Sequence, residues 1–267
     1  MSASPSQLGD LLRHWRGVRR TSQLALAADA GTTPRYVSFV ETGRAQPSRH
    51  MVLRLGRALD VPLRERNDLL LAAGYAPLYT LAALDSPQLT RVHTALGSML
   101  DQHDPLPAVV MDRGWNVLRA NRGAAQLFTH LLAPAPMPDD ANVLRLMVEP
   151  GPVRDRVLNW TAVVPALLER ARREAVGGVL DGPTASLVRD LRARADVARI
   201  LAEPDPLHAA APVIDVEFRV GDDAISFFSV VSTIGTPIDV TAQELRLEAF
   251  FPSDDASRAA WRAFAAG

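Results

Sequence analysis

Arg35, Ser38 and Phe39 form the clearest group of side chains in this sequence whose types and spacing suit recognition chemistry. Val37 and Val40, three residues apart, predict the buried side of a helix that also carries this group. The other side of that helix would present a guanidinium, a hydroxyl and an aromatic ring. Arginine can donate two hydrogen bonds to a guanine edge, and an aromatic ring can contact a thymine methyl group. The pattern therefore favours reading of base edges in DNA.

Two short helices joined by a tight turn are predicted to position these side chains. Ser22 is a suitable N-cap for the first helix, and Gly31 ends it because glycine tolerates the left-handed backbone conformation. Thr33 is the corresponding cap of the second helix, Pro34 takes its first position, and Gly43 follows its end. A helix this short fits a major groove, where its N-terminal part would meet base edges.

This segment resembles the Xre-type helix-turn-helix family. In that family a Gln opens the first helix, Ala-Gly marks the turn, and the motif E-x-G-R-x-x-P-S follows the reading helix. The matching residues here are Gln23, Ala30-Gly31 and residues 41–48. The sequence departs from the family pattern at Thr21 and Leu24, where the family often has an apolar and an acidic residue.

The resemblance assigns roles to individual residues. It implies that Gln23 binds a phosphate, that Arg35 and Ser38 contact bases, and that Arg44 contacts the DNA backbone. Phe39 occupies a reading position, where we expect an apolar contact with a thymine methyl group. The predicted DNA-contacting residues are Gln23, Thr33, Arg35, Ser38, Phe39 and Arg44.

Three more amphipathic helices are predicted around this pair, over residues 6–16, 48–59 and 62–73. Each carries leucine residues at helical spacing, and Gly74 follows the last one. The N-terminal fold is therefore predicted to be an all-α five-helix domain of the lambda-repressor type.

Charge divides the chain. Residues 1–80 carry a net charge of +5 and the remainder carries −6, which fits a nucleic-acid-binding module joined to a module of another kind. The absence of Cys excludes disulfides and thiolate metal sites. Apolar runs stay well short of ~18 residues, so we expect no membrane insertion and a cytoplasmic location.

From Ala108 onward the pattern changes. A strand, an Asp-Arg-Gly turn, a second strand and a helix starting near Asn121 are predicted, followed by a mostly helical stretch over residues 141–203. Strands return in IDVEFRV, AISFFSVVSTIG and LRLEAFF before a terminal helix. This α+β order predicts a PAS-like domain, with one sheet around helices. The predicted division is 1–75 for the helix-turn-helix domain, 76–104 for a linker and connecting helix, and 105–267 for the PAS-like domain.

Several phrases of the second half resemble the ligand-binding domain of MmyB-like transcription regulators. They include VVMDRGWNVLRANRGAAQLF, NVLRLMVEPGPVRD and FFSVVSTIGTPIDVTAQELRLEAFFPSD. Together with the Xre-type segment, the resemblance covers about residues 6–262. It implies a PAS-like fold and an apolar ligand such as a fatty acid.

A mostly apolar site with a few polar groups is the pattern expected for such a ligand. Val110 and Leu118 are apolar candidates, and an inward-facing arginine would suit a carboxylate head group. The predicted ligand-binding residues are Met111, Asn121, Phe128, Leu144, Arg145, Leu146, Asn159, Trp160, Phe227, Phe228, Ser232 and Phe250.

Enzyme chemistry finds little support in the sequence. The six His residues show no zinc-binding spacing, and no nucleophile elbow, P-loop or Rossmann fingerprint occurs. No catalytic residue, metal or cofactor is therefore predicted, although a flavin or haem, or an enzyme joined to a DNA-binding domain, remain alternatives.

The sequence predicts a DNA-binding transcription regulator of bacterial type that acts as a homodimer, because one short helix reads too few base pairs for useful specificity. The alternative is a constitutive DNA-binding protein whose second domain serves only dimerisation or partner docking.

Overall fold

The structure is a computed structural model that describes residues 5–175, 182–202 and 213–266. The chain forms two compact units. The first contains the chain up to Ala82 together with Pro237–Gln243. The second contains Ala83–Glu174, Pro183–Thr236 and the chain from Glu244 onward.

Five short helices make up most of the first unit. Two of their N-caps are the ones that the sequence predicts: the Ser22 hydroxyl accepts a hydrogen bond from the Ala25 N–H at 3.1 Å, and the Thr33 hydroxyl accepts one from the Tyr36 N–H at 3.2 Å. Leucine, valine and tryptophan side chains from these helices form one buried core. The predicted five-helix fold is confirmed. The helices are α1 (Pro5–Arg19), α2 (Gln23–Asp29), α3 (Pro34–Glu41), α4 (Arg49–Ala58) and α5 (Leu63–Ala72).

Helix α1 runs one turn beyond its predicted end at Arg16. The extra turn carries Arg19, whose guanidinium donates hydrogen bonds to the carbonyl oxygens of Leu59 at 3.0 Å and Asp60 at 2.6 Å. These tertiary bonds stabilise the end of the helix, and a local sequence pattern does not contain them.

The second unit is built on an antiparallel sheet with the strand order β2-β1-β5-β4-β3. The long strand β4 pairs with β5 from Phe227↔Pro252 to Thr233↔Arg246, so a hairpin with a long connection forms the middle of the sheet. The α+β, PAS-like prediction is confirmed as a curled five-stranded sheet with helices. The strands are β1 (Ala108–Met111), β2 (Val117–Ala120), β3 (Val216–Val220), β4 (Asp223–Thr233) and β5 (Arg246–Pro252).

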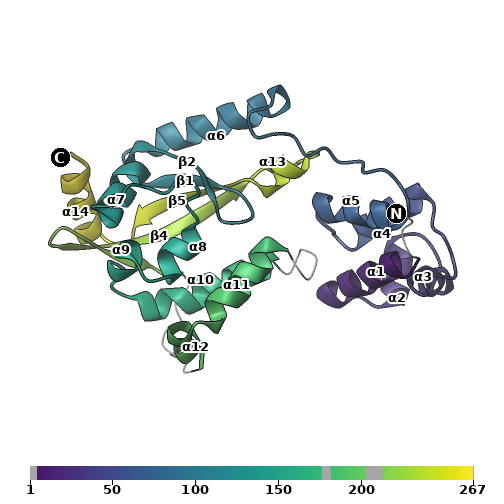
Figure 1. Cartoon of the computed structure of the whole chain (residues 1–267). Helices are drawn as coiled ribbons and strands as arrows, with labels where there is room; N and C mark the ends of the chain where they lie inside the picture. The colour runs from purple at the N-terminus through teal and green to yellow at the C-terminus, as the bar shows by residue number, and fades with distance from the viewer. Residues whose placement is uncertain (1–4, 176–181, 203–212, 267) are drawn as a thin grey trace. The chain divides into compact units, whose positions relative to one another are not determined.

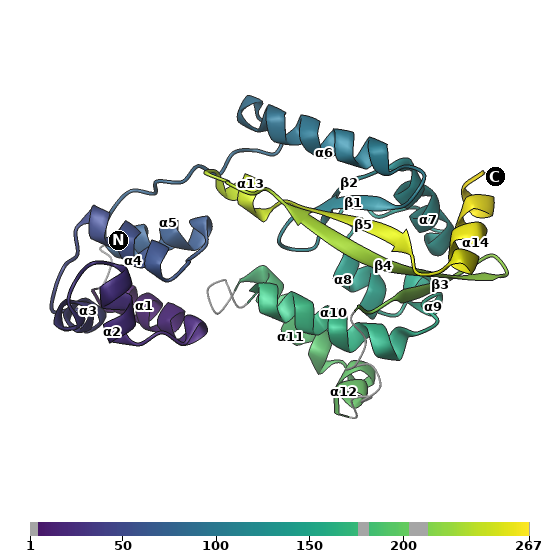
Figure 2. The ribbon, with the colours of Figure 1, turned by 180° about the vertical axis from the view of Figure 1, so that it is seen from behind.

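Helices cover both faces of this sheet (Figure 1). Helix α6, preceded by the short 3-10 turn η1, packs over alternate residues of β1 and β5 on one face. Helices α7, α8 and α10 pack on the other face, and Figure 2 shows α6 and α10 on opposite sides of the strands. The bounds are η1 (Pro87–Leu89), α6 (Thr90–His103), α7 (Arg122–Leu132), α8 (Val143–Val148), α9 (Pro152–Asp155), α10 (Trp160–Ala175), α11 (Pro183–Ala193), α12 (Ala195–Ala202) and α14 (Asp255–Ala266).

The connection between β4 and β5 contains a helix that the sequence pattern did not indicate, α13 (Val240–Glu244). Asp239 precedes it and accepts a hydrogen bond from the Ala242 N–H at 3.1 Å, as an N-cap does. Asp239 also accepts bonds from the Thr80 hydroxyl at 2.7 Å and the Ala82 N–H at 3.0 Å. This segment therefore belongs to the first unit by its contacts, although strands of the second unit flank it in the chain.

Candidate functional site

Helix α3 presents a polar and aromatic side chain group away from its core. Val37 and Val40 are buried, whereas Arg35 is exposed and Ser38 and Phe39 are half-buried. The Thr33 hydroxyl accepts a hydrogen bond from the Tyr36 N–H at 3.2 Å, which fixes the start of the helix. The guanidinium carbon of Arg35 lies 5.2 Å from the centre of the Phe39 ring, so these two side chains form a cation–π pair on the presented side.

A buried carboxylate supports this surface from behind. Glu41, at the end of α3, is 2 % exposed and accepts hydrogen bonds from the Arg16 guanidinium at 2.5 and 3.1 Å. The hydrogen bond to Glu41 raises the pKa of Arg16 above its usual value, despite the opposing effect of burial. The ion pair therefore joins α1 to the end of α3.

The same carboxylate orients Gln23. The Gln23 side-chain amide donates a hydrogen bond to Glu41 at 2.8 Å, which uses one of its two N–H donors. The predicted phosphate-binding side chain thus bonds to Glu41 of α3, which is itself bonded to Arg16 of α1. Sequence analysis did not identify Arg16 as part of this arrangement, although the conspicuous Glu41 that ends the reading helix was a usable signal.

The second unit contains an apolar cavity of about 280 Å³ between its sheet and α7, α8 and α10. Strand alternation places residues of β1, β4 and β5 in its wall, and the turn before β2 adds Trp115. The apolar lining residues are Val109, Met111, Trp115, Phe128, Val143, Met147, Val163, Ala166, Leu167, Val213, Ile214, Val216, Phe218, Phe227 and Phe250.

Four polar side chains complete the cavity wall: Arg170 and Arg173 from α10, Ser229 from β4 and Glu248 from β5. Glu248 is 5 % exposed, and it accepts two hydrogen bonds from Arg170 at 2.9 and 3.1 Å and one from the Ser229 hydroxyl at 2.5 Å. Burial lowers the pKa of Arg170, but the bonds and attraction to Glu248 outweigh it and leave that pKa raised. The cavity is therefore apolar along most of its wall and charged at one end.

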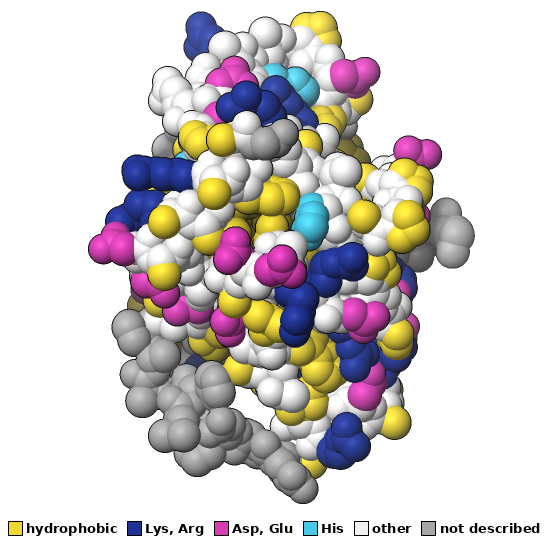
Figure 3. All heavy atoms as spheres, turned by 90° about the vertical axis from the view of Figure 1, so that its left-hand side faces the viewer, with side chains coloured by type: hydrophobic (Ala, Val, Ile, Leu, Met, Phe, Trp, Pro, Cys, Tyr) yellow, Lys and Arg dark blue, Asp and Glu magenta, His cyan; other side chains and the backbone are white. Residues whose placement is uncertain are grey.

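One face of the molecule is more polar than that interior. The face in Figure 3 shows basic and acidic side chains intermingled, with apolar side chains in a hollow near its middle. On this face, such mixing does not provide the concentrated positive field on which nucleic-acid binding depends.

Comparison with protein families supports the assignment of both units. A family model described as the MmyB-like transcription regulator ligand binding domain matches residues 92–264. The chain belongs to the MmyB-like transcription regulators. A helix-turn-helix domain model matches residues 7–69, which contain α2 and α3. A comparison with curated proteins gave no match. The families are those of a DNA-binding domain and a ligand-binding domain, not of enzymes, so the chain is a ligand-responsive transcription regulator.

Four of the predicted ligand-binding residues line the cavity of this MmyB-like domain: Met111, Phe128, Phe227 and Phe250. Phe228 and Ser232 alternate with the inward residues of β4, so they lie on the opposite face of the sheet, where Phe228 stacks on Phe251 at 5.5 Å. Val110 and Leu118 also lie on that opposite face, in the apolar cluster that packs against α6.

Four other predicted ligand-binding residues do not line the cavity and have structural roles instead. The Asn121 amide oxygen accepts bonds from the N–H groups of Ala124 and Ala108, both at 2.9 Å, and so caps α7. Asn159 bridges the backbone of Asp215 and Glu217. The Trp160 N–H bonds to the Met147 carbonyl at 2.8 Å, and Leu144 is fully buried in the core.

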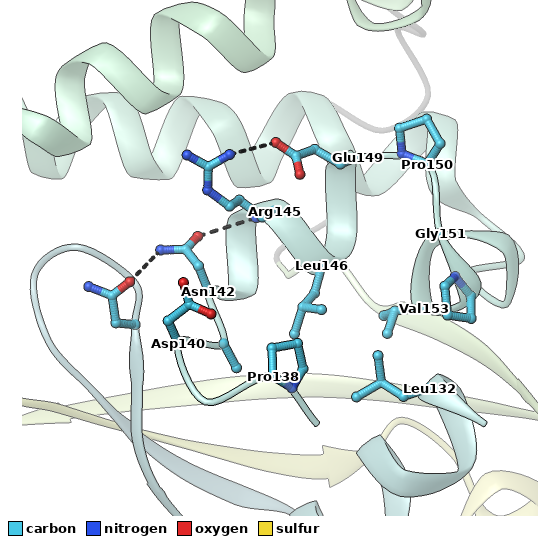
Figure 4. Close-up of a pocket in the computed structure, with 13 residues that line it drawn as sticks. Leu132, Pro138, Asp140, Asn142, Arg145, Leu146, Glu149, Pro150, Gly151 and Val153 are labelled. Atoms are coloured by element: carbon cyan, nitrogen blue, oxygen red, sulfur yellow. Dashed lines mark hydrogen bonds and ion pairs between the residues drawn. The ribbon is translucent and has the colours of Figure 1, made fainter. Parts of the chain in front are cut away.

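Arg145 and Leu146 line a second pocket of about 360 Å³ (Figure 4). The Arg145 guanidinium pairs with Glu149 at 2.8 Å across one turn of helix. Asn142 accepts a hydrogen bond from the Arg145 N–H at 3.2 Å and donates one to Asn116 at 2.9 Å. The polar groups drawn here thus bond mainly to one another.

Sequence analysis missed the charged part of the apolar cavity, which is formed by Arg170, Arg173 and Glu248. A signal was present for Glu248, because a carboxylate inside the apolar strand LRLEAFF shares a face with Phe250. Among the described residues there is no group of three metal-ligating His, Asp or Glu side chains. Those residues also include no helix with the length and hydropathy to cross a membrane.

Proposed function

We propose that this regulator binds operator DNA as a homodimer through α3 and that an apolar acid, such as a fatty acid, occupies its MmyB-like domain and changes its affinity for DNA. The observation that carries this proposal is the 280 Å³ cavity, which has an apolar wall and guanidinium groups at one end.

The size and lining of the cavity support the ligand class. Its volume lies near the lower end of the range of about 300–1,000 Å³ for small-molecule pockets, so one medium-length alkyl chain is the expected occupant. Arg173 is exposed at this wall, and a guanidinium binds a carboxylate through charge-assisted hydrogen bonds.

The DNA-binding part of the proposal rests on α3 and its support. Arg35, Ser38 and Phe39 would meet base edges, whereas Gln23, Thr33 and Arg44 would contact the phosphate backbone or fix the helix on it. Resemblance to Xre-type proteins supports these roles and implies a bacterial regulator. A homodimer would double the number of base pairs read.

Native mass spectrometry of the purified full-length protein, followed by organic extraction, tests the ligand. A co-purifying fatty acid would support the proposal and supply the compound for titration. Selection from a random duplex pool would then give the operator, and its affinity would be measured with and without that compound. Identical affinities would exclude regulation by the ligand.

A constitutive regulator, whose MmyB-like domain serves only assembly, is the alternative. An empty dimer that binds neither dodecanoate nor longer fatty acids, yet binds operator tightly, would favour it.

A further inference from the structure

Trp115 lines the cavity, and its side chain carries an unpaired polar group. The residue is fully buried, and its indole N–H has no hydrogen-bond acceptor within the described part of the chain. Buried N–H groups in folded proteins nearly always have a partner, because an unpaired one has lost its bond to water. An indole N–H can only donate, so the missing partner is an acceptor.

A second unpaired donor lies beside the indole. The guanidinium carbon of Arg246 is 5.1 Å from the centre of the Trp115 ring, and the Arg246 Nε–H also has no acceptor among the described residues. The other nitrogens of this guanidinium bond to the Asp112 carbonyl at 2.8 Å and to Glu174. Two neighbouring side chains, Trp115 and Arg246, therefore each carry an unpaired donor.

The backbone holds the indole in a fixed orientation. Trp115 has φ of 68°, a left-handed conformation that is costly for a bulky residue. The backbone N–H of Trp115 donates a hydrogen bond to the Asp112 carbonyl at 3.1 Å, and the Asn142 side chain donates one to the Gly114 carbonyl at 2.7 Å. A turn that is anchored on both sides keeps the donor preorganised for a ligand.

Charge determines the kind of acceptor. Arg170 lies 4.6 Å from the Trp115 ring centre, so guanidinium groups approach the ring from two residues. The charged residues that line the cavity are Arg170 and Arg173 against Glu248, an excess of one positive charge. Glu248 is already engaged by Arg170 and Ser229, so this excess favours an anionic acceptor brought by the ligand.

We propose that the Trp115 indole N–H donates a hydrogen bond to a carboxylate oxygen of the ligand, which makes Trp115 a specificity-determining residue for acids over other apolar molecules. This inference rests on the proposed function, because it assigns the polar end of the ligand in the same cavity.

The test compares the affinities of dodecanoate and dodecylamine, which share an alkyl chain but differ in having an acceptor or only donors. Trp115→Phe keeps a buried aromatic ring and removes the donor. We expect the variant to bind dodecanoate about 10- to 100-fold more weakly, since the lost bond is charge-assisted, and to bind dodecylamine within about 2-fold of the wild type. Isothermal titration calorimetry on the full-length protein gives both affinities.

Trp261→Phe is the matched control, because the Trp261 N–H already bonds to the Pro105 carbonyl at 3.0 Å. Its dodecanoate affinity should stay within about 2-fold of the wild type, as no ligand bond is removed. If Trp115→Phe does not fold, the indole N–H resonance of Trp115 in the wild type provides the readout. It should move downfield on addition of dodecanoate and stay in place on addition of dodecylamine.

Equal dodecanoate affinity in the wild type and Trp115→Phe, with an unmoved indole resonance, would overturn the inference alone and leave a bound water as the acceptor. If the wild type binds neither dodecanoate nor dodecylamine, the proposed ligand class is wrong, and this inference falls with it.

Discussion

At the scale of single residues, Arg35 carries the most specific expectation for DNA binding, because its guanidinium is exposed and lies over the Phe39 ring. We predict that Arg35→Ala costs about 1–3 kcal/mol of operator affinity and relaxes specificity at one base pair. Arg35→Lys keeps the charge but loses the two-pronged geometry, so it should lose the base preference while keeping the salt dependence. Binding to duplexes that vary at each position measures both effects, and unchanged affinity for all of them would assign the reading surface elsewhere.

Arg44 is predicted to act on DNA in a different way. If its exposed side chain pairs with a phosphate, Arg44→Ala should weaken binding to all sequences and reduce the slope of log K against log salt by about 1. Fluorescence anisotropy over a salt series measures this slope. Arg189→Ala, which changes an exposed arginine of α11, is the control and should leave both quantities unchanged.

The Arg16–Glu41 pair gives a prediction about stability. Glu41→Gln would leave the partly exposed Arg16 guanidinium without its counter-charge, at a cost of up to about 3 kcal/mol in local stability. Native-state hydrogen exchange of α1 and α3 in the full-length protein measures that cost. Asp10→Asn, at the exposed Arg13–Asp10 pair, should cost less than about 1 kcal/mol. Similar stability costs for the two variants would show that the burial of Glu41 does not strengthen its ion pair with Arg16.

At the scale of secondary-structure elements, α13 and the segment around Thr80 are held together by one carboxylate, that of Asp239. Burial raises the pKa of Asp239, but hydrogen bonds from Thr80, Ala242 and Ala82 outweigh that effect and leave the pKa below its ordinary value. A lowered pKa in the folded state means that the carboxylate stabilises this contact above about pH 4. The stabilisation is lost as the pH falls through the lower, folded-state pKa.

The amide resonances of Ala82 and Ala242 report this transition in a pH titration. We expect them to shift together below about pH 4, as the carboxylate gains a proton. In Asp239→Asn they should show no such transition, because the titrating group is gone. Asp222→Asn, in the turn between β3 and β4, should titrate like the wild type. A transition that persists in Asp239→Asn would assign the titration to another group.

At the scale of the whole molecule, the proposed homodimer requires a defined spacing on DNA. Two reading helices related by two-fold symmetry should contact half-sites one helical turn apart, about 34 Å. Inserting about half a helical turn between the half-sites should therefore abolish cooperative binding. Footprinting and sedimentation measure the spacing and the stoichiometry, and a single protein chain per operator with a hyperbolic isotherm would rule the dimer out.

Much of the architecture followed from local patterns. Ser22, Thr33 and Ser48 each accept a bond from the amide three residues ahead. A cap can therefore be recognised in the sequence once the helix that follows it is recognised. The alternation of apolar and polar residues in β3 similarly indicates which side chains share a face. Helix α13 escaped notice because it is only a turn long and its apolar residues, Val240 and Ala242, are buried by long-range contacts.

The sequence by itself indicated the two kinds of domain, the caps of α2 and α3 and the inward face of β3, because these depend on neighbours a few residues apart. Only the tertiary structure decided which inward side chains line a cavity and which fill the core. It brought Trp115, Arg170 and Glu248 together from three separate elements and left the indole N–H without a partner. A cavity depends on packing between residues distant in the chain, and no short-range pattern records whether that packing is complete.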